Sequence, residues 1–303
     1  MASKAKSAEK LLTLVPTVWY KMNPHGFHGA LYRPTENRYP GKAMIMLGSE
    51  DGQYALTRYM AEIFVREGMT VLALAVCGVE GLPQKFEELP LEMVEKAADR
   101  LGRLGIRKII LWGYSLGATA ALSAAALCPE KISGVVAING TDFLPQSMSA
   151  APFSFHKKSC FGWKGEPLPY EPLKCGPLQI AGDCLREQSY VLRSCFAGTT
   201  EHLKNENAFI PAERITCPVL LLTAHEDQMW PAEAYAKRLI HRLDENDAEG
   251  EHTHMSFATA SHWLLPAAVQ IRRRWKMERE HSEECTASRQ VAHRLTMEFL
   301  GRV

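Results

Sequence analysis

The sequence predicts a mostly parallel, doubly wound α/β sheet, and three observations support this fold class. Short apolar runs alternate with longer segments of helical period along most of the chain. Its 303 residues suffice for one large domain with an insertion. Hydrophobic residues make up 46% and charged residues 23%, as in ordinary globular proteins. We therefore expect a single domain over residues 1–303, with helices on both faces because continuous apolar strands need burial on both sides.

The strands and helices are expected in a regular order. Two β-leaning runs around a proline and glycine turn, Thr17 to Met22 and Phe27 to Tyr32, predict an antiparallel hairpin. Apolar runs typical of buried strands follow at Ala43–Leu47, Thr70–Val76, Lys108–Trp112, Val135–Asn139, Val219–Thr223 and Thr253–Ala258. Helical periodicity lies between them at Tyr54–Glu67, Leu91–Leu104, Leu116–Leu127 and Ala232–Leu243, with a last helix near Ser288–Leu300.

The alternation fails between Thr141 and Ile215. This segment of about 75 residues is rich in Pro, Gly and Cys and carries aromatic residues with weak periodicity. A structureless loop of that length is uncommon in a compact domain. We therefore expect residues 141–215 to form a lid or cap over the carboxyl edge of the sheet, with a decorative insertion as the alternative. A second irregular stretch, Ile271 to Glu284, is dense in charge and is interpreted as a solvated connector.

Charge and composition argue against several classes of function. The 35 basic and 34 acidic residues give a net charge of +1, which favours neither nucleic acid nor membrane partners. The sequence has no apolar window as long as a membrane helix and no export signal, so we expect a cytoplasmic protein. Its eight cysteines form no C-x-x-C pair and are expected to be reduced. No phosphate-binding glycine motif occurs, so no cofactor is expected.

The strongest local motif is a G-x-S-x-G, Gly113-Tyr-Ser-Leu-Gly117, at the junction of a strand and an alanine-rich helix. Its glycines allow a sharp backbone turn with Ser115 at the apex, and the N–H groups of the following helix point toward the site. This context is typical of a nucleophile elbow. The alternative is a glycine-flanked turn with an ordinary serine.

A nucleophilic serine needs an imidazole as base and a carboxylate that orients the imidazole. Asp227 follows a buried strand and is the expected acid, with the adjacent Glu226 as the alternative. Of the 11 histidines, only His262 has both the chain order and the position expected of the base. The remaining candidates, His225, His252 and His254, are expected to be surface or strand residues. His252 and His254 could be two metal ligands, but the sequence offers no third ligand at a suitable spacing, so we expect no metal site.

The oxyanion formed by attack on an acyl group needs two preorganised donors. The N–H of Leu116, directly after the expected nucleophile, is the first. A second is expected from the loop after the first parallel strand, where the Ser49 N–H is preferred and the Glu50 N–H is the alternative. The alternative is that this loop is an ordinary glycine-containing turn with no role in binding the oxyanion.

Several spaced motifs occur in one order along the chain: Gly113-Tyr-Ser-Leu-Gly-Ala118, Val136-Ala-Ile-Asn-Gly140, Glu226-Asp-Gln-Met-Trp230, Tyr235-Ala-Lys-Arg-Leu239 and Ala260-Ser-His262. With these motifs the chain resembles the dienelactone-hydrolase-like α/β-hydrolase domain of type I acyl-CoA thioesterases and bile acid-CoA:amino acid N-acyltransferases. This resemblance extends from about Gly41 to the C-terminus. It implies an α/β-hydrolase fold and a triad of Ser115, Asp227 and His262. The acyltransferase members carry cysteine as the nucleophile, so the serine here favours water as the acyl acceptor.

The sequence thus predicts a serine hydrolase that cleaves a small-molecule acyl thioester through an acyl-enzyme. One alternative is a carboxylesterase of dienelactone-hydrolase or peptidase type, which the same triad would serve. A second is a non-catalytic relative that binds a ligand or partner through the aromatic insertion.

Overall fold

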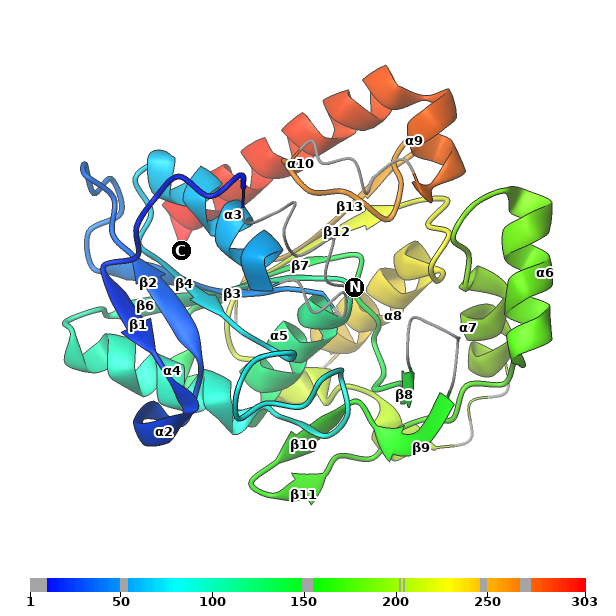
Figure 1. The fold of residues 1–303 in the computed structure, drawn as a ribbon, viewed down its shortest axis with the longest axis horizontal. Coiled ribbons are helices and arrows are strands. Elements are labelled where there is room, and N and C mark those ends of the chain that lie inside the picture. Colours follow the sequence, from blue (N-terminus) through cyan, green and yellow to red (C-terminus); the bar gives the residue numbers. More distant parts are fainter. Residues whose placement is uncertain are drawn as a thin grey trace.

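The computed structural model describes residues 10–49, 54–148, 155–201, 203, 205–245, 250–267 and 274–303. An eight-stranded sheet in the order β1-β2-β4-β3-β6-β7-β12-β13 forms its centre (Figure 1). From β4 to β13 all neighbouring strands are parallel, whereas β1 and β2 are antiparallel at one edge. The mostly parallel sheet predicted from the sequence is therefore confirmed. Its strands are β1 (Val18–Tyr20), β2 (Gly29–Tyr32), β3 (Lys42–Leu47), β4 (Val71–Leu74), β6 (Lys108–Tyr114), β7 (Gly134–Ile138), β12 (Val219–Ala224) and β13 (His252–Phe257).

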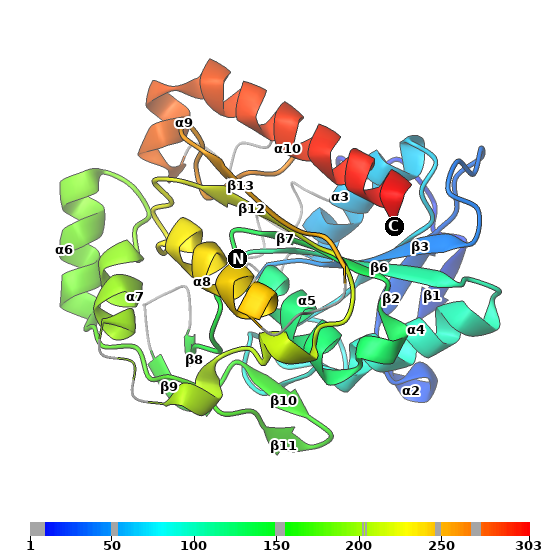
Figure 2. The ribbon, with the colours of Figure 1, turned by 180° about the vertical axis from the view of Figure 1, so that it is seen from behind.

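Helices cover both faces of the sheet. Helices α4, α5 and α8 pack on one face, and α3 and α10 pack on the other (Figures 1 and 2). Each face has its own apolar core, and every residue of β7 is buried between the two cores. Burial on both faces explains why the parallel strands are continuously apolar. The helix bounds are α3 (Tyr54–Arg66), α4 (Glu92–Arg103), α5 (Leu116–Leu127), α8 (Ala232–Glu245) and α10 (Ser282–Arg302).

The structure differs from the sequence-based prediction at two places, the N-terminal hairpin and the start of the last helix. The predicted N-terminal hairpin pairs as β1 with β2, and the short helix α2 (Met22–His25) replaces a simple turn between them. The last helix begins at Ser282 rather than near Ser288, because the charged residues before Ser288 continue the helical backbone of α10. Within the described parts of the chain, no helix combines the length and the apolar character needed to cross a membrane.

The segment 141–215 contains short elements of its own. It holds the strand pair β8 (Gln146–Met148) and β9 (Phe155–Ser159), and β10 (Phe161–Trp163), which pairs with β11 (Glu166–Pro167) and β5 (Leu89–Pro90). Helices α6 (Pro177–Glu187) and α7 (Arg193–Thr200) follow, then the single turns Glu206–Ala208 and Ala212–Arg214.

The expectation that all cysteines are reduced is wrong for one pair. Cys175 and Cys195 form a disulfide, with their Cα atoms 5.2 Å apart. Cys195 lies on α7, and Cys175 lies just before α6. The two residues are 20 positions apart within the irregular segment, so only its folded path brings them together.

The interpretation of Ile271 to Glu284 as a solvated connector is also wrong for part of the stretch. Helix α9 (Lys276–Glu280) lies within it. Trp275 and Glu278 are 5% and 3% exposed, so two side chains of this charged stretch are buried in the protein interior.

Candidate active site

Ser115 sits at a sharp turn between the end of β6 and the start of α5. Its φ angle of 60° is uncommon for a residue with a side chain. The flanking glycines make this turn possible. A Cβ on Gly113 would lie 2.3 Å from the carbonyl oxygen of Gly117, and a Cβ on Gly117 would lie 2.2 Å from that of Gly48. The G-x-S-x-G motif thus adopts the strand–turn–helix geometry of a nucleophile elbow.

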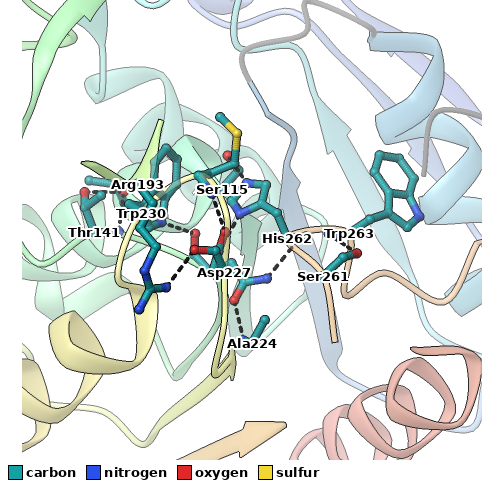
Figure 3. Close-up of polar contacts among 12 residues, drawn as sticks. Ser115, Thr141, Arg193, Ala224, Asp227, Trp230, Ser261, His262 and Trp263 are labelled. Atoms are coloured by element: carbon teal, nitrogen blue, oxygen red, sulfur yellow. Dashed lines mark hydrogen bonds and ion pairs between the residues drawn. The ribbon is translucent and has the colours of Figure 1, made fainter. Parts of the chain in front are cut away.

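The side chains of Ser115, His262 and Asp227 form one chain of hydrogen bonds (Figure 3). His262 Nε2 lies 2.9 Å from Ser115 Oγ, and His262 Nδ1 lies 2.7 Å from Asp227 Oδ2. The three residues follow β6, β12 and β13, and the carboxyl ends of these parallel strands meet at one edge of the sheet. Ser115 is 4% exposed, His262 2% and Asp227 0%, so the hydrogen bonds are shielded from water.

The structure separates the two candidate acids. The second carboxylate oxygen of Asp227 accepts the N–H of Met229 at 2.8 Å, which holds the side chain toward His262. By contrast, the Glu226 side chain is 58% exposed and pairs with His225 at 3.5 Å. Asp227, rather than the adjacent Glu226, therefore contacts the histidine.

The other candidate histidines have different partners. His225 is 56% exposed and pairs with Glu233 as well as Glu226. On strand β13, His254 Nε2 lies 2.8 Å from the Thr223 hydroxyl, and burial lowers the pKa of His254. His252 Nδ1 lies 3.7 Å from a carboxylate oxygen of Asp244.

The two expected oxyanion donors lie on neighbouring segments. Leu116 opens helix α5. Ser49 directly follows Gly48, whose carbonyl oxygen packs against Gly117 in the first turn of that helix. This close approach places the loop after β3 beside the start of α5. The alternative donor, Glu50, lies outside the described residues.

Asn139 connects His262 to the end of β12 and to Trp230 in the loop that carries Asp227, a role that the sequence analysis missed. Its side-chain Nδ2 donates to the backbone carbonyl of His262 at 2.9 Å, and its Oδ1 accepts the N–H of Ala224 at 2.8 Å. The backbone carbonyl of Asn139 accepts the indole N–H of Trp230 at 3.0 Å. The available signal was a polar residue at the carboxyl end of a buried apolar strand.

Aromatic rings surround His262. The rings of Tyr114, Trp230 and Trp275 have their centroids 5.2, 4.9 and 5.9 Å from that of His262. Trp230 meets the imidazole at an interplanar angle of 82°, so it presents an edge-to-face contact. These rings restrict the orientation of the imidazole and exclude water from around it.

Helix α7 of the segment 141–215 packs on residues 225–231, the loop between β12 and α8 that carries Asp227 and is called the acid loop below. Arg193 Nη1 donates to the backbone carbonyl of Asp227 at 2.7 Å (Figure 3). The N–H groups of Leu192 and Arg193 donate to the carbonyl of Gln228 at 3.0 Å, and the ring of Phe196 lies 4.9 Å from that of Trp230. Part of the segment 141–215 thus borders the site directly.

A family model described as BAAT / Acyl-CoA thioester hydrolase C terminal matches residues 89–271, which include all three hydrogen-bonded residues. The chain belongs to this family. It spans about half the length of the curated relatives it matches. Acyl-coenzyme A amino acid N-acyltransferase 1 of Mus musculus is 28% identical over 223 residues, which are 71% of this chain and 46% of that protein. Mitochondrial acyl-coenzyme A thioesterase 2 of Rattus norvegicus is 27% identical over 214 residues, or 70% and 43%.

Solved structures show the same fold. A protein from Klebsiella pneumoniae, provisionally assigned as a dienelactone hydrolase, superposes with a TM-score of 0.57 at 14% identity, covering 94% of this chain and 98% of that chain. A provisionally assigned hydrolase from Bacillus subtilis has a TM-score of 0.53 at 12% identity, covering 98% and 97%. This member of the BAAT C-terminal family has the α/β-hydrolase fold, as the sequence motifs predicted.

Proposed function

We propose that this protein is a serine hydrolase that cleaves acyl thioesters through a covalent acyl-enzyme. The observation that supports the proposal is the buried chain of hydrogen bonds from Ser115 to His262 to Asp227. Membership of a family named after acyl-CoA thioester hydrolases favours a thioester as the substrate.

In the first half of the reaction, Ser115 Oγ attacks the acyl carbonyl carbon while His262 Nε2 accepts the hydroxyl proton. Asp227 accepts the Nδ1–H of His262, which keeps Nε2 free for that proton and stabilises the imidazolium. The N–H groups of Leu116 and Ser49 hold the negative oxygen of the tetrahedral intermediate. His262 then returns the proton to the leaving sulfur, which departs as a thiol and leaves the acyl group on Ser115.

In the second half, water replaces the thiol. His262 Nε2 takes a proton from water as the water oxygen attacks the acyl carbon, and Ser115 Oγ leaves and recovers the proton. The products are a carboxylic acid and the free enzyme. A serine at the nucleophile position supports water rather than an amine as the acceptor, because the family resemblance implies cysteine at that position in the acyltransferases.

The segment 141–215 acts as a lid in this proposal. The contacts of Arg193 and Phe196 with the acid loop support this role, since they tie α7 to the loop that carries Asp227. The low exposure of Ser115 supports this role further. Its side chain is 4% exposed, so a covering segment has to move before substrate can reach it.

The proposal is tested by thiol release from a panel of acyl-CoAs, beside hydrolysis of p-nitrophenyl esters. We compare wild type with Ser115→Ala and with Ser123→Ala. The control removes a second buried hydroxyl of the same region, which bonds to Thr119 O within helix α5. Thioester turnover that disappears in Ser115→Ala and persists in Ser123→Ala is the expected result.

Other outcomes separate the alternatives. Turnover of esters alone, through Ser115, would replace the thioesterase by a carboxylesterase that uses the same residues. A protein that neither hydrolyses any substrate nor reacts with a fluorophosphonate at Ser115 would be a binding relative. Undiminished turnover by Ser115→Ala would contradict the mechanism.

A further inference from the structure

Glu278 and Arg289 form a buried ion pair beside the loop that carries His262. Arg289 Nη1 lies 2.5 Å from Glu278 Oε1, and the two side chains are 4% and 0% exposed. A buried ion pair is weak evidence for stabilisation, because taking two charges out of water costs roughly as much as their attraction returns. The hydrolytic steps described above use neither residue.

Ser261 connects this ion pair to His262. The Ser261 hydroxyl donates to Glu278 Oε1 at 2.7 Å and accepts the backbone N–H of Trp263 at 3.0 Å. Ser261 and Trp263 flank His262 on its two sides. One hydroxyl, oriented by Glu278, therefore fixes the backbone before and after the histidine. Ser261 is 1% exposed, so water does not compete for these bonds.

Residues 274–289, which include Glu278 and Arg289, also contact the acid loop through Ser189. Ser189 Oγ lies 2.9 Å from the side-chain oxygen of Gln228, the neighbour of Asp227, and it accepts the N–H of Lys276 at 3.0 Å. Trp275, beside Lys276, places its ring 5.9 Å from that of His262. Residues 274–289 thus contact the surroundings of both His262 and Asp227.

We propose that Glu278, held in place by Arg289, is a positioning residue that keeps His262 against Ser115 through the Ser261 hydroxyl. The inference rests on the proposed function, in which His262 is the base. A base transfers a proton efficiently only within hydrogen-bond reach, and a small displacement of its ring lowers the rate without changing substrate affinity. The pair therefore acts on kcat rather than on KM.

A matched pair of double variants tests the hydrogen bond apart from the charges. Glu278→Gln with Arg289→Met removes both charges but keeps an oxygen that accepts from Ser261. Glu278→Met with Arg289→Met removes the charges and that acceptor, with side chains of similar volume. We expect kcat of the first to stay within about twofold of wild type and kcat of the second to fall by about tenfold, at unchanged KM. Equal kcat values for the two double variants would overturn the proposal.

Single variants test the link at Ser261. Ser261→Ala is expected to lower kcat by about tenfold and Ser261→Thr to restore most of it, because threonine keeps the hydroxyl. Thr296→Ala is the control, since it removes a buried hydroxyl of α10 that bonds to Ala292 O. If Ser261→Ala and Thr296→Ala lower kcat equally, the loss reflects packing and the positioning role is wrong.

A spectroscopic measurement separates this inference from the proposed function. The Nδ1–H of His262, which donates to Asp227, gives a downfield proton NMR signal that does not require turnover. We expect this signal to shift or broaden in Ser261→Ala and in the double variant with Glu278→Met, but not in Thr296→Ala. Absence of any hydrolysis by wild type would refute the proposed function, and an unchanged signal in Ser261→Ala would refute the positioning role.

Discussion

The side-chain amide of Asn139 donates a hydrogen bond to the backbone carbonyl of His262, at 2.9 Å. Its other end accepts the N–H of Ala224, three residues before Asp227, at 2.8 Å. Asn139 lies at the end of the central strand β7, between the strands that precede Ser115 and Asp227. One fully buried side chain thus joins the backbone of His262 to the end of β12, the strand that precedes Asp227.

Replacement of Asn139 is expected to lower both stability and activity. Asn139→Ala leaves the buried His262 carbonyl and Ala224 N–H without partners, and each unsatisfied group costs about 1–3 kcal/mol of unfolding free energy. It also places alanine at a φ of 49°. Denaturant unfolding and ester hydrolysis measure the two effects. Asn139→Gly is the control, because glycine accepts this φ without strain yet also lacks the amide. Unchanged kcat in Asn139→Gly would show that the amide does not position the site.

The difference between Asn139 and Ser115 shows what the sequence could and could not predict. Ser115 lies in a local motif whose glycines dictate the turn, and the order of Asp227 and His262 after buried strands predicts the hydrogen-bonded contacts that the structure has. Asn139 acts through residues far away in the chain, and its one local signal, a polar residue at the end of a buried strand, does not indicate which residues it contacts. Long-range packing likewise decides the burial of Glu278 and the pairing of Cys175 with Cys195, and local sequence patterns therefore do not predict either feature.

The acid and its neighbour offer a direct test of which carboxylate orients His262. Asp227→Asn keeps the shape of the side chain but lets it donate to Nδ1, which stabilises the wrong tautomer of the imidazole. If the proposed mechanism holds, kcat should fall by about 10⁴-fold, as for the equivalent substitution in a Ser-His-Asp enzyme. Glu226→Gln should leave kcat unchanged, since the Glu226 side chain is 58% exposed and pairs with His225. The comparison uses p-nitrophenyl ester hydrolysis at a fixed pH. A larger loss in Glu226→Gln would reverse the assignment.

The second glycine of the elbow should not tolerate a side chain. In Gly117→Ala, the new Cβ would lie 2.2 Å from the carbonyl oxygen of Gly48, so the loop that carries Ser49 must move. Strain of this kind typically costs about 1–3 kcal/mol of unfolding free energy, and we expect kcat to fall as well because a proposed oxyanion donor shifts.

Gly102 provides the matched control for that substitution. It lies within α4, and a Cβ there would meet no atom of the described residues within 4 Å, apart from its chain neighbours and the backbone of its own helix. Gly102→Ala should therefore raise the unfolding free energy by about 0.5–1 kcal/mol, because alanine is the better helix former. Thermal unfolding of both variants tests this contrast. Similar melting temperatures would show that the loop yields easily to a side chain at Gly117.

Thiol reactivity should distinguish Cys184 from three buried cysteines, Cys128, Cys217 and Cys285. Burial raises the pKa of Cys128 and Cys217 to about 12 and that of Cys285 to about 11, so at pH 8 these side chains carry almost no reactive thiolate. Cys184 is only partly buried. We expect a fast reaction of the native protein with a disulfide reagent such as DTNB at Cys184 alone among these four, and slow reaction of the others until denaturant is added. Cys184→Ser should remove the fast phase, whereas a fast phase that survives this substitution would show that another thiol is accessible.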